Sequence, residues 1–290
     1  MSEGVDPNRL STLSLLANIS LAGVKLLVGF FGNSFALIAD GIESLADIVS
    51  SAIVWTGVRI SDKSADHDHP YGHGKAEAIA ALLASVGLLV SATFIGVNAV
   101  REILVPHHTP ALFTVPVLVV IVLIKEWLHH VLLHSGRRME SGALKAEALH
   151  HRSDSLTSLG VLVGIGIAIF AGPGFEAADD IAALLVTVLI VYNAIRIARP
   201  ALDELMDKRV EDFRIDAIDK LSRAITGIEC LETIVVRRSG REFVAEIHME
   251  VAPEMSIEKG HRLSHQLKDA LLADPSLRLT HVVVHVEPFG

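Results

Sequence analysis

The stretch Ser34-Phe-Ala-Leu-Ile-Ala-Asp-Gly-Ile-Glu-Ser-Leu-Ala-Asp47 begins an apolar segment that continues to Val58 and yet carries three acids. On a helix Glu43 and Asp47 are i,i+4 neighbours, and Asp40 lies one turn before Glu43 on the same face. Near the centre of a bilayer each ionised carboxylate costs about 2.5–3.5 kcal/mol. Three acids on one stripe therefore predict a cation site inside a membrane.

The composition is that of a membrane protein with a small soluble part. Of the 290 residues 51% are hydrophobic, and the mean hydropathy is +0.48, which is too apolar for a typical soluble domain. The formal net charge of -9 argues against nucleic acid as a partner. A single cysteine, Cys230, excludes a multi-cysteine metal site. Fifteen histidines favour metal chemistry, because histidine is a common ligand for borderline metals.

Six apolar stretches reach, or nearly reach, the ~20 residues that a hydrocarbon core needs. They are Leu10–Phe31, Phe35–Val58, Ala76–Val100, Leu112–Leu133, Ala143–Phe170 and Ile181–Ile197. Most Lys and Arg residues near these stretches fall on the side of both chain ends, which predicts cytoplasmic termini. We therefore expect a multi-pass membrane protein with a bundle of six transmembrane helices over residues 1–207. A bacterial inner membrane is the expected location.

From Val210 the pattern changes to that of a small soluble α/β domain. Helices are predicted over Glu211–Ile225 and Ser256–Ala273, and strands over Leu231–Arg238, Glu242–Val251 and Thr280–Glu287. The order α-β-β-α-β predicts a ferredoxin-like sheet that is covered on one face. We expect this cytoplasmic domain to span residues 208–290.

The fifth apolar stretch opens with a second pair of possible ligands. His150 and Asp154 repeat the i,i+4 spacing of Glu43 and Asp47. Two helices that each present two ligands one turn apart can complete a tetrahedral N/O site, which suits zinc. Alternatively, these groups join helices by hydrogen bonds or lie at a wet helix end. Two matched pairs favour the metal site.

Four motifs are spread over nearly the whole chain. They are Ser-Leu-Ala-Asp47 preceded by Glu43, the loop Tyr71-Gly-His-Gly-Lys-Ala-Glu77, the segment His150-His-Arg-Ser-Asp154, and Ile247-His-Met-Glu250. Together they resemble the motifs of the cation diffusion facilitators, a family of divalent-metal/proton antiporters. The resemblance implies a transport site at Glu43, Asp47, His150 and Asp154, a homodimer, and a transporter without enzymatic activity.

The resemblance further implies export of Zn²⁺ from the cytoplasm in exchange for protons by alternating access. Zinc-transporting members usually carry Asp or His where this chain has Glu43, so an iron, cobalt, cadmium or manganese exporter is the alternative. His150 favours zinc, iron or cobalt over manganese, which prefers oxygen ligands. Because imidazole titrates near neutrality, His150 is also the expected proton carrier.

Two rival functions come from other classes. A membrane metalloenzyme needs an open coordination position with a general base, and the chain has no H-E-x-x-H motif. A membrane-anchored metal sensor would not need paired ligands inside the bilayer. Both rivals are therefore less favoured than a transporter.

The loop after the second apolar stretch is polar, and the resemblance implies a second metal site there with ligands Asp66, His69 and His73. A solvated loop that binds metal only weakly is the alternative. The resemblance also implies that Lys75 pairs with Asp207 in a charge interlock that holds the helices together at the membrane surface. Such a pair could equally contribute less than ~1 kcal/mol.

In the C-terminal domain the resemblance implies regulatory metal ligands at His248, His261, His285 and Glu287, with Glu232 where some relatives have His. Histidines on the polar face of a sheet are otherwise ordinary surface residues. We favour ligands on the strength of the matched motif.

Some charged residues within the apolar stretches have no place in these sites. Asp40 is read as an acid at the helix start or on the access path. At the end of the fourth stretch we favour interfacial residues over an access relay for His129, His130 and His134. Lys125 and Glu126 are expected either to pair with neighbours or to snorkel towards the interface.

Overall fold

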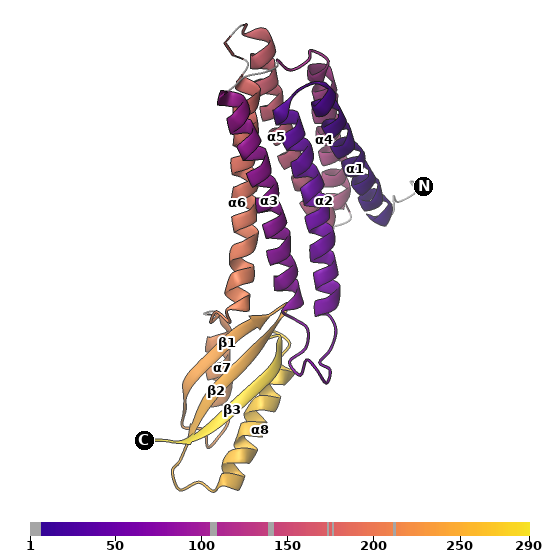
Figure 1. Cartoon of the computed structure of the whole chain (residues 1–290). Coiled ribbons are helices and arrows are strands. Elements are labelled where there is room, and N and C mark those ends of the chain that lie inside the picture. Colours follow the sequence, from indigo (N-terminus) through magenta and orange to yellow (C-terminus); the bar gives the residue numbers. More distant parts are fainter. Residues whose placement is uncertain (1–6, 105–108, 139–141, 173, 176, 211–212) are drawn as a thin grey trace, which may run out of the picture. The chain divides into compact units, whose positions relative to one another are not determined.

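Six long helices form the part of the chain that is expected to cross the membrane (Figure 1). They are α1 (Pro7–Phe31), α2 (Phe35–Ser61), α3 (Ala76–Leu104), α4 (Thr114–Arg138), α5 (Gly142–Phe170) and α6 (Ala178–Leu205). In this computed structural model the described residues are 7–104, 109–138, 142–172, 174–175, 177–210 and 213–290. By their contacts the residues form two units, 1–52 with 84–196 and 53–83 with 197–290.

Each helix overlaps one predicted apolar stretch. Among the described residues, five helices are long and apolar enough to cross a membrane, namely 12–31 of α1, 147–170 of α5, and the whole of α3, α4 and α6. The remaining helix, α2, has 27 residues but carries Asp40, Glu43 and Asp47. The predicted six-helix fold is confirmed. The helix that is less apolar than the other five is α2, which holds the three acids.

Small residues let the helices of the first unit approach closely. In α4, a Cβ atom at Gly136 would lie 3.0 Å from the backbone nitrogen of Lys145 in α5. At the other end of α5, a Cβ atom at Gly164 would lie 2.4 Å from the Cβ of Ala182 in α6. Such close contact through small residues is the usual way in which helices pack in membranes, where no hydrophobic effect drives them together.

The C-terminal part of the chain has the predicted order α-β-β-α-β. Its elements are α7 (Phe213–Arg223), β1 (Cys230–Ser239), β2 (Glu242–Val251), α8 (Ile257–Ala273) and β3 (Leu279–Pro288). The strand order is β1-β2-β3, with β1 antiparallel and β3 parallel to β2. Glu211, the predicted start of the first helix, lies outside the described residues.

Alternation along β2 separates the core of this part from its polar face. Ile247 and Met249 are fully buried and pack against α8 through Leu267, while His248 points to the other face. Because successive side chains of a strand point to opposite faces, the polar residues of β2 and β3 gather on one side of the sheet. His248 lies opposite His285 in the register, which places two imidazoles on that side.

The close contact at Gly164 gives a test of the helix packing. We expect Gly164→Ala to destabilise the protein by about 1–3 kcal/mol, because the new methyl group overpacks the contact with α6. Gly160, one turn earlier on α5, has no atom within 4 Å of an added Cβ, so Gly160→Ala is the matched control. Thermal unfolding in detergent measures both, and equal midpoints for the two variants would contradict this packing.

Candidate metal centre

Helices α2 and α5 bring together three of the four residues predicted to form the membrane site. The ligand atoms of Asp47, His150 and Asp154 all lie within 4.8 Å of one another. On α5 the i,i+4 spacing places His150 Nε2 3.7 Å from Asp154 Oδ2. His150 is 43% exposed and Asp154 14%, so the group is open on the histidine side and closed on the carboxylate side.

Glu43, the fourth predicted ligand, is not part of this close group. It lies within electrostatic range of Asp40, Asp47 and Asp154. Its Oε2 atom is buried and has no hydrogen-bond partner among the described residues. A buried polar atom without a partner is costly, so this oxygen calls for a ligand from outside the protein.

Lys125 also belongs to this site. The sequence left open whether its side chain pairs with neighbours or snorkels. Its side chain is 1% exposed, and its ammonium group donates to Oδ2 of Asp154 and to Oδ1 of Asn18 at 3.0 Å. Of the two alternatives for Lys125, pairing is therefore confirmed and snorkelling is wrong. Snorkelling requires a position near a helix end, whereas Lys125 lies in the middle of α4.

A second buried lysine holds Asp40. Lys25 Nζ donates to Asp40 Oδ1 at 2.8 Å and to the hydroxyl of Ser44 at 3.1 Å, and Ser158 donates to Asp40 Oδ2 at 2.8 Å. Asp40 therefore joins α1, α2 and α5, and it neither caps the start of α2 nor lies on an open path. The sequence feature that could have predicted this ion pair is Lys25 itself, because a lone lysine inside an apolar stretch needs a partner.

A further polar contact from α1 reaches the residue next to His150. Ser14 Oγ lies 2.6 Å from Nε2 of His151, which is fully buried. Nδ1 of His151 is also buried and has no hydrogen-bond partner among the described residues. Sequence analysis did not single out Ser14 or His151, and the signal for Ser14 is its spacing from Lys25 on one face of α1.

The three histidines of α4 differ in how far they are buried. His129 is buried, with Nδ1 2.7 Å from the carbonyl oxygen of Ala148, so the expectation of an interfacial residue is wrong at this position. The reason is that His129 lies on the face of α4 that packs against α5. His130 and His134 are exposed, and His130 lies 3.3 Å from the carboxylate of Glu126.

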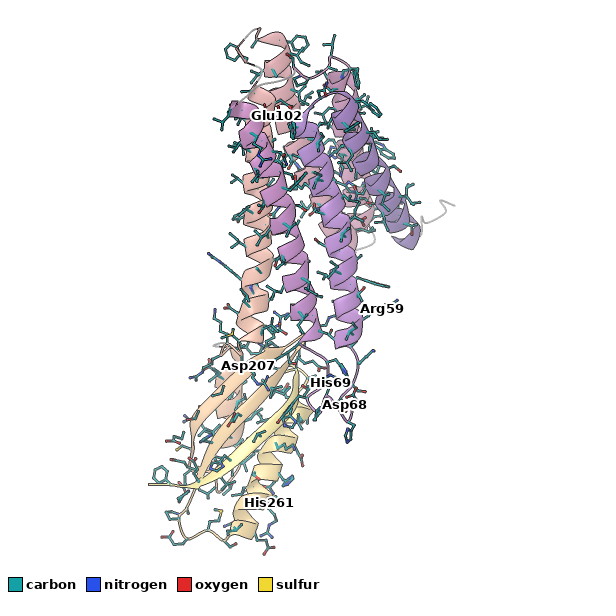
Figure 2. The ribbon with its side chains drawn as sticks, viewed as in Figure 1. Arg59, Asp68, His69, Glu102, Asp207 and His261 are labelled. Carbon is teal, nitrogen blue, oxygen red and sulfur yellow. The ribbon has the colours of Figure 1, made fainter. Side chains whose placement is uncertain are left out.

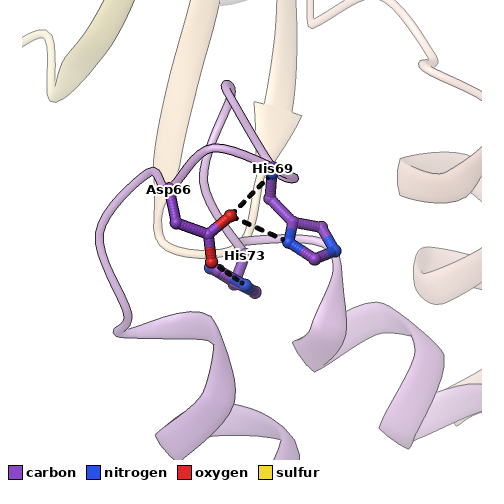
Figure 3. A group of neighbouring side chains, drawn as sticks. All are labelled: Asp66, His69 and His73. Carbon is purple, nitrogen blue, oxygen red and sulfur yellow. Dashed lines mark hydrogen bonds and ion pairs between the residues drawn. The ribbon is translucent and has the colours of Figure 1, made fainter.

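The loop after α2 forms a compact group in which one carboxylate is shared by two imidazoles (Figure 3). Asp66 Oδ1 lies 3.1 Å from His69 Nδ1, and Asp66 Oδ2 lies 3.3 Å from His73 Nε2. The two rings are 4.3 Å apart. All three predicted loop ligands are thus close enough to share one metal ion.

A backbone hydrogen bond within the loop favours the ionised form of Asp66, which is the form that binds a metal ion. The backbone N–H of His69 donates to Asp66 Oδ1 at 2.7 Å, and this bond holds the pKa of the Asp66 carboxyl below its usual range. The carboxylate is therefore ionised at neutral pH. Nδ1 of His73 is buried and has no hydrogen-bond partner among the described residues.

Lys75 meets Asp207, as the resemblance implied. Lys75 Nζ and Arg237 Nη1 each donate to Oδ1 of Asp207 at 2.9 Å (Figure 2 labels Asp207). The hydrogen bond from Lys75, together with the charge of Arg237, holds the pKa of Asp207 below its usual value. Asp207 has a φ of 53°, a left-handed conformation that Asp and Asn adopt more readily than other non-glycine residues.

The polar face of the C-terminal sheet holds a third group. His248 Nδ1 lies 2.9 Å from Glu287 Oε1, and His285 Nε2 lies 3.3 Å from the same oxygen. Glu232 Oε2 is 4.0 Å from His248 Nδ1. The ligand atoms of Glu232, His248 and Glu287 lie within 4.8 Å of one another, and an imidazole–carboxylate set of this kind fits a borderline divalent metal.

A bulge explains why Glu232 joins this group and α8 explains why His261 does not. The register of β1 against β2 shifts between Leu231 and Thr233, so Glu232 is the extra residue. Bulges commonly re-aim a side chain in this way. His261 lies on α8 (Figure 2), with its ring 4.6 Å from that of His265, and the structure does not bring it to the other four predicted ligands.

Two family descriptions match the chain. The cation efflux transmembrane domain matches residues 11–206. The cytoplasmic domain of cation efflux proteins matches residues 210–289. Together these matches extend over nearly the whole chain.

Similar proteins cover the chain almost completely. The manganese efflux system protein MneP of Bacillus subtilis is 28% identical over 97% of this chain and 96% of its own length. An uncharacterized transporter of Methanocaldococcus jannaschii is 30% identical over 94% of this chain and 96% of its own length. The cation-efflux pump FieF of Cronobacter sakazakii is 28% identical over 98% of this chain and 94% of its own length.

Among solved structures, MamM-CTD H285A covers 27% of this chain and 95% of its own, at 18% identity. Its TM-score of 0.26 is too low to support an argument about this chain.

The interlock at Asp207 predicts a pH-dependent contribution to stability. Because the pKa of Asp207 is lowered in the folded protein, its contribution is present above the ordinary aspartate pKa of about 3.9 and is lost as the pH falls through the lowered value. We expect Asp207→Asn, which suits the left-handed backbone, to lower the unfolding midpoint at pH 7. Since Asp207 is 46% exposed, the loss should stay below about 1 kcal/mol.

Thermal unfolding at pH 7 and at pH 3 measures this effect. The difference between wild type and Asp207→Asn should be smaller at pH 3, because an ordinary aspartate of the unfolded chain is already largely protonated there. Asp203→Asn removes an exposed aspartate that pairs with Lys208 at 2.6 Å outside the interlock, and it serves as the control. A difference as large at pH 3 as at pH 7 would refute the electrostatic origin.

Proposed function

The chain belongs to the cation efflux family, the cation diffusion facilitators, and from this premise we propose that it exports Zn²⁺ from the cytoplasm in exchange for protons. Members of this family are transporters of cations and not enzymes, and the chain is an integral membrane protein. The proposal concerns the metal, the counter-transported proton, and the residues that bind the cargo. It assigns the cargo site to Glu43, Asp47, His150 and Asp154.

One observation supports this assignment above the others. Three ligand atoms from two helices lie within 4.8 Å of one another, and the fourth residue, Glu43, has a buried oxygen without a protein partner. If these groups merely joined helices by hydrogen bonds, Glu43 would be expected to have a partner in the neighbouring helix. An unsatisfied carboxylate beside three ligand atoms is instead suited to a cation that comes and goes.

The charge of the region supports a divalent cargo. If all four are deprotonated, the acids Asp40, Glu43, Asp47 and Asp154 exceed the ammonium groups of Lys25 and Lys125 by two charges. In an interior of low dielectric constant such an excess is costly. One divalent cation balances it, and metal binding displaces protons because ligands must be deprotonated.

The imidazole of His150 makes zinc the preferred cargo. Nitrogen ligands suit zinc, iron and cobalt, whereas manganese prefers oxygen. The longer side chain of Glu43 and the similarity to a manganese efflux protein keep iron, cobalt, cadmium and manganese as alternatives within the same function. His150 is also the proposed proton carrier, because imidazole titrates near neutrality.

The transport cycle we propose is alternating access in a homodimer. Residues 1–207 form the transmembrane domain and residues 208–290 the cytoplasmic domain, with both termini in the cytoplasm of a bacterial cell and the protein in its inner membrane. The groups at Asp66 and at His248 would bind metal at the surface and regulate transport. The interlock of Lys75 with Asp207 would hold the helices together. A membrane-anchored sensor is disfavoured, because sensing needs no ligands inside the bilayer.

Transport by purified protein in liposomes tests the cargo site. With acid inside the vesicles we expect Zn²⁺ uptake, and Asp47→Ala should abolish it because a ligand is lost. Asp62→Ala, which removes an exposed acid just after α2, is the control and should transport normally. Equal flux through wild type and Asp47→Ala would eliminate this site assignment, and a panel of metals would rank the cargo.

Metal titration of the full chain tests the site on the sheet. In a background of Asp47→Ala and Asp66→Ala, which silences the other two groups, His248→Ala should weaken Zn²⁺ binding about tenfold or more. His265→Ala removes an exposed histidine of α8 and should leave the affinity unchanged. If His248→Ala bound Zn²⁺ as tightly as its background, the sheet would have no regulatory metal site.

A further inference from the structure

The ammonium group of Lys125 occupies the ligand atom that a metal ion would need. It donates to Oδ2 of Asp154, and the same oxygen is the one that faces His150 Nε2. An ammonium group and a divalent cation cannot both lie against one carboxylate oxygen without strong repulsion, because the site is buried and poorly screened. A metal ion that binds this oxygen therefore competes with the ammonium for it.

The structure also provides a place for the displaced charge. Lys125 Nζ donates at the same time to Oδ1 of Asn18 on α1, at 3.0 Å. The flexible four-carbon stem of lysine lets its head move without moving the helix. The ammonium can thus leave Asp154 while it keeps an uncharged acceptor at Asn18.

We infer that Lys125 is a tethered counter-cation of the cargo site, which neutralises Asp154 while the site holds no metal and withdraws towards Asn18 when a divalent cation binds. This inference rests on the proposed function. It makes Lys125 a positioning residue that sets how tightly the cargo is held, since metal and ammonium compete for one carboxylate.

The competition has a consequence for both halves of the cycle. In the metal-free protein Lys125 spares the membrane interior a bare carboxylate, which would be costly there. In the metal-bound protein the withdrawn ammonium remains close to the cargo and repels it. Lys125 therefore weakens binding and speeds release, as a transporter needs and a storage site does not.

Lys25 shows what a purely structural buried lysine looks like in the same unit. It is 0% exposed and pairs with Asp40, which is outside the proposed ligand set. Asp40 is held further by Ser158, and Lys25 by Ser44. None of these contacts involves an atom that the cargo would need, so Lys25 has no competitor.

Zn²⁺ uptake by proteoliposomes that contain the full chain tests the inference through KM and Vmax. Lys125→Met should lower KM about tenfold, a coupling of ordinary size between competing ligands, and should lower Vmax because release slows. Lys125→Arg should raise KM, because its rigid fork holds a carboxylate more firmly. Asn18→Leu should also raise KM, since the displaced ammonium loses its acceptor.

Thr93→Val, which removes an exposed hydroxyl of α3 that donates to the carbonyl oxygen of Leu89 at 2.8 Å, is the control outside the site and should leave KM unchanged. If Lys125 had only a structural role, Lys125→Met and Lys125→Arg would change KM in the same direction. That result would overturn the inference. If Lys125→Met does not fold, unchanged KM in Lys125→Arg or Asn18→Leu overturns it equally. Wild-type transport by Asp47→Ala, in contrast, would remove the proposed cargo site itself.

Discussion

Two ammonium groups inside the helical bundle make the arrangement of its acids possible. Lys25 and Lys125 are each at most 1% exposed, and each is paired with a carboxylate of another helix. Without them the acids of α2 and α5 would face one another in an environment where unpaired charges cost several kcal/mol each. The lysines remove part of the excess negative charge and leave a remainder that suits a divalent cation.

This division of charge separates Asp40, which is held by protein groups, from Glu43 and Asp154, which we propose as ligands. Asp40 accepts a hydrogen bond on each oxygen from a group of another helix, one of them the ammonium of Lys25, so its charge is already balanced within the protein. Glu43 has an oxygen with no protein partner among the described residues, and Asp154 is satisfied by a group that can be displaced. The three acids look alike in sequence, and the partners that other helices supply make them different.

The sequence predicted the elements well, because their signals are local. The positions of the six helices follow from runs of apolar residues, but the apolar run does not predict where α6 ends, because this helix continues past the predicted Ile197 to Leu205. The order of the C-terminal elements follows from a change of period from 3.6 to 2. The pairing of His150 with Asp154 also follows from spacing on a single helix. Contacts such as Lys125 with Asp154 or Ser14 with His151 join different helices, and periodicity cannot reveal which faces meet. The same holds for Glu232, whose place near His248 depends on a bulge.

The three groups of imidazoles and carboxylates use the same chemistry at different depths. Asp66 and His69 are more than half exposed, and water and salt screen their charges, so no fixed counter-ion accompanies them among the described contacts of that loop. Among the contacts of the described residues, only the group in the bundle has a lysine on one of its ligands. Since screening by solvent is available at the surface and not in the membrane interior, a buried site that is empty for part of its cycle needs a cation of its own. The lysine in the bundle would meet that need, and this would distinguish the proposed cargo site from the proposed regulatory sites at the surface.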